Sequence, residues 1–210
     1  KIDNLLKKGL GSGEMGVVIA PTGAGKSMAL AHLGAHAVKA GKNVVHYTLE
    51  LSEAVTGQRY DSCISTIPLS TLFGRKDEVL ESIADLKGTL IIKEYPTKTA
   101  STNNIRTHLE KLKKRNKKVD MIIVDYADLL KSCSHHKEKR NELESIYESL
   151  RAIAQEYKCP VWTASQTNRT GLNAEVVTME SISEAFNKCF VADFICSISR
   201  TIKDKNANTA

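Results

Sequence analysis

The sequence from residue 20 reads Ala20-Pro21-Thr22-Gly23-Ala24-Gly25-Lys26-Ser27, after an apolar run and at the start of a helical pattern. Glycines between a buried strand and a helix let backbone N–H groups converge on phosphate oxygens, beside the positive end of the helix dipole. The stretch therefore predicts a P-loop, in which Lys26 contacts the β- and γ-phosphates of a nucleotide and Ser27 ligates Mg²⁺. Ala20 replaces the glycine of the strict pattern, but the flanking strand and helix favour a nucleotide site over an accidental glycine turn.

The composition is that of a soluble globular protein, with 41% hydrophobic and 26% charged residues. Its length suits one α/β domain, and we expect residues 1–210 to form a single domain. No apolar run is long enough to cross a bilayer and no signal peptide is recognisable, so we expect a cytoplasmic protein without membrane contact. Because residue 1 is Lys rather than Met, we expect the chain to be a fragment of a longer protein.

The net charge of +6 is compatible with a polyanionic partner such as nucleic acid, and equally with solubility alone. Six cations cluster at 111–118, where we favour a solvated helix end over a nucleic-acid site, because cations suit a helix C-terminus. The five cysteines are odd in number and contain no C-x-x-C pair. They predict reduced thiols, most of them small core residues, and no zinc site.

Short apolar runs alternate with helical patterns along the chain. Strands are expected at 15–19, 44–49, 89–92, 121–124, 161–165 and 194–199. Helices are expected at 26–40, 53–67, 76–86, 103–115, 138–157 and about 179–188. Strands separated by helices imply crossover connections, so the predicted fold is α/β, with a mainly parallel twisted sheet and helices on both faces.

Three of the expected strands end in a polar residue: Glu50, Asp125 and Gln166. The carboxyl ends of parallel strands share one edge of a sheet, so these residues should meet the P-loop at one phosphate site. We expect Asp125 to hold Mg²⁺, Glu50 to orient and deprotonate an attacking water, and Gln166 to sense the γ-phosphate. For Glu50 a capping or surface role is the alternative, and Asp128 is expected to cap a loop rather than to bind metal.

Asp125 is followed by Tyr126 rather than Glu, so the expected base lies on a neighbouring strand. In this respect the chain resembles the RecA-like P-loop ATPases, and specifically the motor domain of DnaB-type replicative helicases, including their phage relatives. Four stretches carry the resemblance: the P-loop, Thr-Leu-Glu-Leu-Ser at 48–52, Ile-Ile-Val-Asp-Tyr-Ala-Asp-Leu-Leu at 122–130, and Ala-Ser-Gln-Thr-Asn-Arg at 164–169. The second and fourth are fairly specific, whereas the first occurs in all P-loop proteins.

The resemblance implies a Mg²⁺-ATP-dependent helicase motor with Glu50 as its catalytic glutamate. Gln166 would link the nucleotide state to DNA, and Arg59 would lie beside the nucleotide base, although a plain helix-surface charge is the alternative for Arg59. The implied assembly is a homo-oligomer, a ring of six subunits around single-stranded DNA, with primase as a possible partner. If a phage encodes the protein, it would act in the host cytoplasm.

The resemblance also implies that DNA is contacted by loops facing a central channel, here Ser132 to Lys139 and Arg169 to Val177. Their cations could meet phosphates, although ordinary solvated loops would have the same composition. The candidates are Lys137, Lys139, Arg140 and Arg169. The family's arginine finger lies on a strand beyond the one that ends near Arg200, so we expect this chain to lack it and to hydrolyse ATP poorly alone.

Two other functions compete with the motor. A RecA-like nucleotide switch, of the clock-protein or recombination-mediator kind, would hydrolyse ATP slowly and regulate partners without unwinding DNA. A small-molecule P-loop kinase is less favoured, because the sequence has no evident lid rich in arginines.

Overall fold

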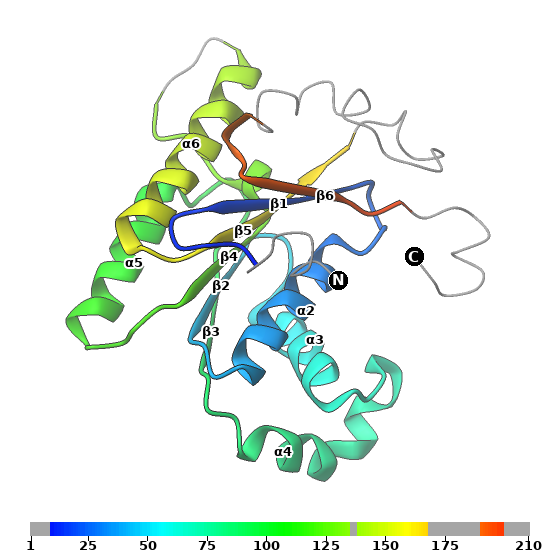
Figure 1. Cartoon of the computed structure of the whole chain (residues 1–210). Coiled ribbons are helices and arrows are strands. Elements are labelled where there is room, and N and C mark those ends of the chain that lie inside the picture. Colours follow the sequence, from blue (N-terminus) through cyan, green and yellow to red (C-terminus); the bar gives the residue numbers. More distant parts are fainter. Residues whose placement is uncertain (1–8, 135–137, 168–189, 200–210) are drawn as a thin grey trace.

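The computed structural model describes residues 9–134, 138–167 and 190–199. Within these ranges six strands form one sheet, in the order β3-β2-β4-β5-β1-β6, and every neighbouring pair is parallel (Figure 1). Their bounds are β1 Met15–Ala20, β2 Val44–Thr48, β3 Leu90–Glu94, β4 Met121–Asp125, β5 Val161–Gln166 and β6 Phe194–Ser197. The predicted parallel sheet is therefore confirmed.

Helices cover both faces of the sheet (Figure 1). On one face lie α2 (Lys26–Lys39) and α3 (Glu53–Ser65), and on the other α5 (Thr102–Lys114) and α6 (Lys139–Tyr157). The remaining elements are short: α4 (Lys76–Ala84) and the 3₁₀ helices Leu69–Arg75 and Ala127–Leu129. No helix in the described ranges is both long enough and apolar enough to traverse a bilayer.

Alternation along β2 shows how the two cores are built. Val45 and Tyr47 face the core under α5 and α6, whereas Val44 and His46 face α2 and α3. Close packing also requires glycine in two places. A Cβ atom on Gly16 would lie 2.6 Å from the ring of Trp162, and one on Gly34 would lie 2.1 Å from the Tyr60 hydroxyl.

The ends of the predicted helices and strands lie within three residues of the observed ends for every element in the described ranges. Ser52 caps α3 by accepting a hydrogen bond from the Val55 N–H, and Ser101 forms a capping box with Asn104 at α5. The helix expected at about 179–188 lies outside the described residues.

One expectation about the core was wrong. Most cysteines were expected to be small core residues, but of the four described cysteines Cys159 alone is fully buried. Cys133 is exposed because it lies in a loop beyond the end of β4. Residue type does not reveal which side chains another element covers, and the same holds in α4, where Val79 is buried but Leu80 is 59% exposed.

Candidate functional site

The P-loop connects β1 to α2 at the carboxyl edge of the sheet. Gly23 and Gly25 have φ values of 74° and 105°, in the left-handed region that side chains disfavour, which explains the two glycines. Gly25 is the N-cap of α2, and no side chain among the described residues caps this helix. The first N–H groups of α2 are therefore not occupied by a capping side chain, as an anion site requires.

Lys26 is buried beneath the loop, with 7% of its surface exposed. Its Nζ donates to the carbonyl oxygens of Ala20 (3.3 Å) and Pro21 (3.2 Å), and lies 5.7 Å from the ring centroid of Tyr126. Burial lowers the pKa of Lys26, and the nearby negative charges of Glu50, Asp125 and Asp128 oppose that shift. The ammonium group thus lies close to the carboxylates that the sequence placed at this edge.

Asp125 is the last residue of β4 and is 1% exposed. Among the described residues, neither of its carboxylate oxygens has a hydrogen-bond partner of good geometry. Burial raises its pKa to about 6, and the Glu50 charge adds to this, while the Ser27 hydroxyl and the charges of Arg59 and Lys26 act against it. A buried carboxylate without partners beside a serine hydroxyl is an oxygen donor set that fits Mg²⁺.

Glu50 is exposed and lies in a bend just after β2. The bend is fixed by the Thr48 hydroxyl, which donates to the Leu51 carbonyl (2.7 Å) and accepts from the Leu51 N–H (3.1 Å). Pairing with β4 continues into it, because the Leu49 N–H donates to the Asp125 carbonyl at 2.8 Å. Glu50 therefore extends from an anchored turn beside Asp125.

Gln166 is the last residue of β5 and connects the P-loop to the end of β4. Its Nε2 donates to the Thr22 hydroxyl, and its Oε1 accepts from the Tyr126 hydroxyl at 3.2 Å. Thr22 belongs to the P-loop and Tyr126 directly follows Asp125. Sequence reasoning missed this role for Tyr126, although its position next to Asp125 was a signal that could have indicated it.

Arg59 lies on α3 and is half-buried. It is close enough for its charge to act on Asp125 and on His46, so it belongs to the same end of the sheet. His46 is completely buried within β2, its Nδ1 is 2.9 Å from the Tyr60 hydroxyl, and burial lowers its pKa to about 3. This buried polar pair, which joins α3 to the sheet, was not predicted.

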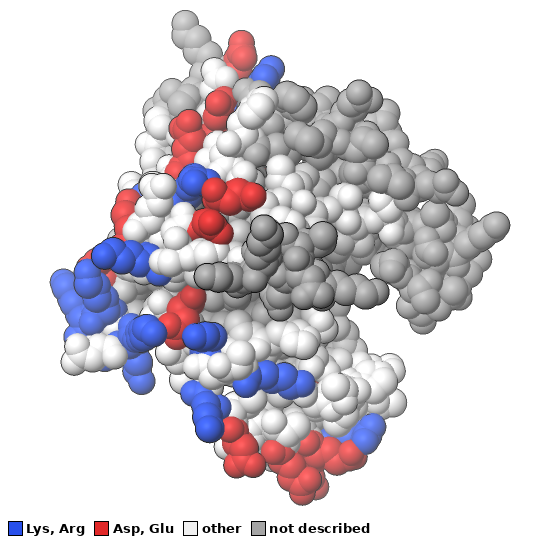
Figure 2. Space-filling model, in the orientation of Figure 1, with Lys and Arg blue, Asp and Glu red and all other residues white. Residues whose placement is uncertain are grey.

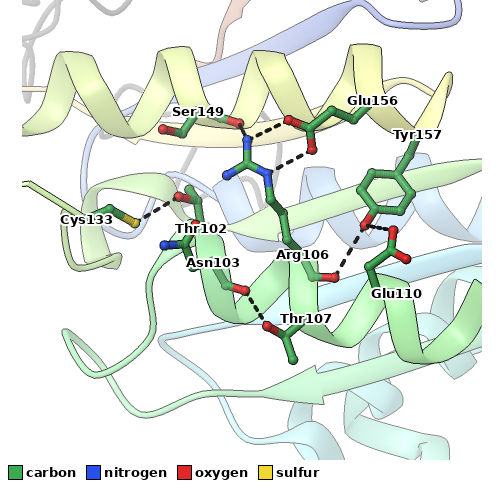
Figure 3. Close-up of polar contacts among 9 residues, drawn as sticks. All are labelled: Thr102, Asn103, Arg106, Thr107, Glu110, Cys133, Ser149, Glu156 and Tyr157. Atoms are coloured by element: carbon green, nitrogen blue, oxygen red, sulfur yellow. Dashed lines mark hydrogen bonds and ion pairs between the residues drawn. The ribbon is translucent and has the colours of Figure 1, made fainter.

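Two of the four DNA-contact candidates are described: Lys139 and Arg140 are the first residues of α6 and are exposed. Lys137 and Arg169 lie outside the described residues. The loop that precedes α6 is attached to α5, since the Lys131 N–H donates to the Ala100 carbonyl (2.8 Å) and Cys133 Sγ lies 3.4 Å from the Thr102 hydroxyl (Figure 3).

Asp128 connects the end of β4 to the opposite helix layer. It accepts a hydrogen bond from the Tyr147 hydroxyl of α6 at 2.9 Å and one from the Ser165 hydroxyl of β5 at 3.3 Å. Its side chain thus holds α6 against the sheet.

Comparison with known proteins gives consistent matches. The model of the DnaB-like helicase C-terminal domain family matches residues 1–178. The DnaB-like replicative helicase of Enterobacteria phage T4 is 31% identical, over 95% of this chain and 45% of its own length. The replicative DNA helicase DnaB of Leifsonia xyli subsp. xyli is 30% identical, over 78% of this chain and 37% of its own. The chain therefore spans less than half the length of these two relatives.

Solved structures agree on the fold. A DnaB-like replicative helicase, described with its interactions with primase, superposes with a TM-score of 0.81 at 17% identity, covering 96% of this chain and 50% of that one. A second solved structure, described as an ATPase domain, gives a TM-score of 0.79 at 16% identity, covering 96% of this chain and 74% of that one. The RecA-like α/β fold predicted from the sequence is thereby confirmed.

Proposed function

The chain belongs to the family of DnaB-like helicase C-terminal domains, and from this premise we propose that it is the Mg²⁺-ATP-dependent motor of a replicative DNA helicase. The motor would couple ATP hydrolysis to translocation on single-stranded DNA and to duplex unwinding. One observation carries the proposal: Lys26 at the start of α2, Asp125 at the end of β4 and Glu50 just after β2 lie together at the carboxyl edge of the sheet, where the charge of Glu50 acts on both Lys26 and Asp125. The family matches favour this motor over the nucleotide switch.

Each residue of the site then has a role in phosphoryl transfer. The backbone of residues 20–27 and the Lys26 ammonium hold the phosphates, and Arg59 lies beside the base. Ser27 and Asp125 would hold Mg²⁺, which would supply neutralisation of the phosphate charge during transfer. The unpartnered carboxylate of Asp125 supports this assignment.

Glu50 acts as the general base that orients and deprotonates the attacking water. Its exposure is consistent with that role, because a base must reach solvent-derived water, while its anchored turn fixes its distance from Asp125. Gln166 senses the γ-phosphate. Gln166 contacts Thr22 of the P-loop and Tyr126 after β4. A movement of the P-loop at the phosphates would therefore shift the ends of β4 and β5, which precede the candidate DNA loops.

The proposed partners follow the family. Lys139 and Arg140, with Lys137 and Arg169, contact the phosphates of single-stranded DNA, in a homo-oligomeric ring of six subunits in the cytoplasm. Primase is a further candidate partner, since one structural match is described with its primase interactions.

A matched pair of glutamate variants tests the mechanism. Glu50→Gln should lower ATP turnover by about 10²- to 10⁴-fold, the usual contribution of a general base, while nucleotide binding persists. Glu53→Gln is the control, because Glu53 lies close by in sequence and its carboxylate already accepts from the Glu94 N–H at 2.9 Å. Turnover and fork unwinding would be measured in the full-length parent protein. Ordinary turnover by Glu50→Gln would refute the assigned mechanism.

A further inference from the structure

A cavity lined by lysines lies at the amino edge of the sheet, opposite the P-loop. Its volume is about 750 Å³, and its cations are Lys42, Lys113, Lys117, Lys118 and Lys158. They lie before β2, before β5, and in or after the last turn of α5, so residues distant in sequence meet at one edge. Figure 2 shows basic side chains gathered over this region, at the end of α5.

The two described carboxylates that line the cavity have partners that leave four of the five lysines without an ion pair to them. Asp120 accepts from the Asn43 N–H (3.0 Å), from Asn43 Nδ2 (2.9 Å) and from Lys118 (2.7 Å). Glu156 forms two hydrogen bonds with Arg106 of α5, at 2.8 and 3.0 Å (Figure 3). In the part of the chain that the structure describes, Lys118 is the one lysine of the five that forms an ion pair.

Helix ends do not account for this many cations. Helices α2, α5 and α6 all end at this edge, and each C-terminus carries about −0.5 of an elementary charge. Three ends therefore require about one or two positive charges. The cavity has five lysines, and α5 adds Lys111, Lys114 and Arg115 at its end. The excess of positive charge points to an external anion.

We propose that this lysine cavity binds the phosphate backbone of single-stranded DNA, as a second DNA surface separate from the loops at the carboxyl edge. Lysines are point charges on flexible stems, which suit phosphate contacts without sequence readout. Tyr157, the one aromatic residue that the structure describes in the lining, has its hydroxyl tied to Glu110 at 2.8 Å. The surface thus binds backbone rather than bases.

The two surfaces hold different parts of the nucleic acid. Lys139 begins α6 and Lys158 directly follows its end, so the 19-residue helix separates them by about 28 Å. The inference rests on the proposed function only in the choice of DNA as the anion, and it adds a site that the motor mechanism does not use.

A neutralised pair tests the surface. The double variant Lys113→Gln/Lys117→Gln should bind a fluorescent thymidine oligonucleotide with a weaker salt dependence. The slope of log K against log salt should become shallower by about 1.4, because each lost phosphate contact contributes about 0.7. The control, Arg75→Gln/Lys76→Gln, removes two exposed cations at the start of α4 that do not line the cavity, and should leave the slope unchanged. Equal slopes for the two variants would overturn the proposal.

Lysine acetylation followed by mass spectrometry locates the contact without mutation. The oligonucleotide should protect Lys42, Lys117 and Lys158 but not Lys76, in the parent and equally in Glu50→Gln, the variant designed to lower turnover. Failure of the motor mechanism would therefore leave the protection intact. Uniform labelling, or protection by a polyglutamate peptide as strong as by DNA, would overturn the proposal, the latter in favour of an acidic protein partner.

Discussion

Strand β4 has an aspartate at each end, Asp120 immediately before its first residue and Asp125 as its last. Asp120 is half-buried and has three hydrogen-bond donors. Its burial would raise the pKa, but hydrogen bonds from Lys118 and Asn43 outweigh it and hold the pKa of Asp120 below its ordinary value. Asp125 is buried without such partners, and its pKa rises to about 6.

This contrast separates an acid that stabilises the fold from one that we propose to bind Mg²⁺. A carboxylate whose oxygens are saturated by donors gains from being charged, whereas a buried one without partners costs the fold free energy. The same strand thus carries a structural acid at its amino end and a candidate metal ligand at its carboxyl end. The whole sheet shows the same difference between its edges. The candidate site residues converge at the carboxyl edge, and the lysine cavity lies at the amino edge.

The largest expected effect is on catalysis. Asp125→Asn should lower ATP turnover by at least about 100-fold, because a metal ion contributes several kcal/mol of transition-state charge stabilisation. Asp120→Asn, the same chemical change at the other end of β4, should leave turnover within about twofold, an effect far below that of metal loss. Comparable losses in both variants would remove the functional distinction between the two acids.

The next effect is a gain in stability that depends on pH. Asp125 binds a proton more readily in the folded state, so the stability of the metal-free protein falls as pH rises from the unfolded pKa of about 3.9 to about 6. Asp125→Asn removes that loss, and should be more stable than the parent by about 2–3 kcal/mol at pH 8 and by little at pH 4. Urea unfolding in EDTA measures this. A variant that is less stable than the parent at pH 8 would contradict the prediction.

At the other end of the strand the sign should reverse. The Asp120 carboxylate stabilises the fold above its unfolded pKa, and this contribution is lost as pH falls through the lower folded pKa. Asp120→Asn should therefore cost about 1–2 kcal/mol at neutral pH, as expected for weakened charge-assisted hydrogen bonds. The midpoint of urea unfolding reports it, and a stabilised Asp120→Asn would show that the contrast has been misread.

The smallest effect sharpens the site itself. Tyr126→Phe removes the hydrogen bond to Gln166, worth about 0.5–1.5 kcal/mol, so turnover should change by about two- to tenfold. Tyr95→Phe serves as the control, because the Tyr95 hydroxyl donates to Asn104 at 3.5 Å, away from the site. Unchanged turnover in Tyr126→Phe would show that the hydrogen bond from Tyr126 to Gln166 does not contribute to catalysis, and would leave Gln166 only its contact with the P-loop.

Much of the site could be predicted because each residue ends an apolar run. Buried parallel strands are continuous hydrophobic segments, so the first polar residue after each marks the carboxyl edge. Glu50, Asp125 and Gln166 were located by this rule, although their roles stay predictions. The rule does not give the order of the strands, and the pairing of Thr48 with Asp125 across 77 positions emerges only from the folded sheet.

What the sequence could not give are contacts between elements. The hydrogen bonds of Gln166 with Thr22 and Tyr126 join three strand ends, and the His46–Tyr60 pair joins a strand to α3. The lysine cavity is of the same kind. The cations at 111–118 were interpreted from the sequence as a solvated helix end, because cations suit a helix C-terminus. Lys42 and Lys158 are far from them in sequence and meet them only in the fold.

The sequence alone determined the alternation of strands and helices, the P-loop and the edge where the polar residues gather, because these follow from local periodicity and from the glycine conformations of one turn. The tertiary structure decided which charges are neutralised. Asp120 and Asp125 are identical side chains at the two ends of one strand. The donors of Asn43, which another segment brings to Asp120 beside its neighbour Lys118, help make one a stabilising ion, whereas the other is an unsatisfied buried acid. Desolvation and hydrogen bonding depend on surroundings in three dimensions, and sequence neighbours do not specify them.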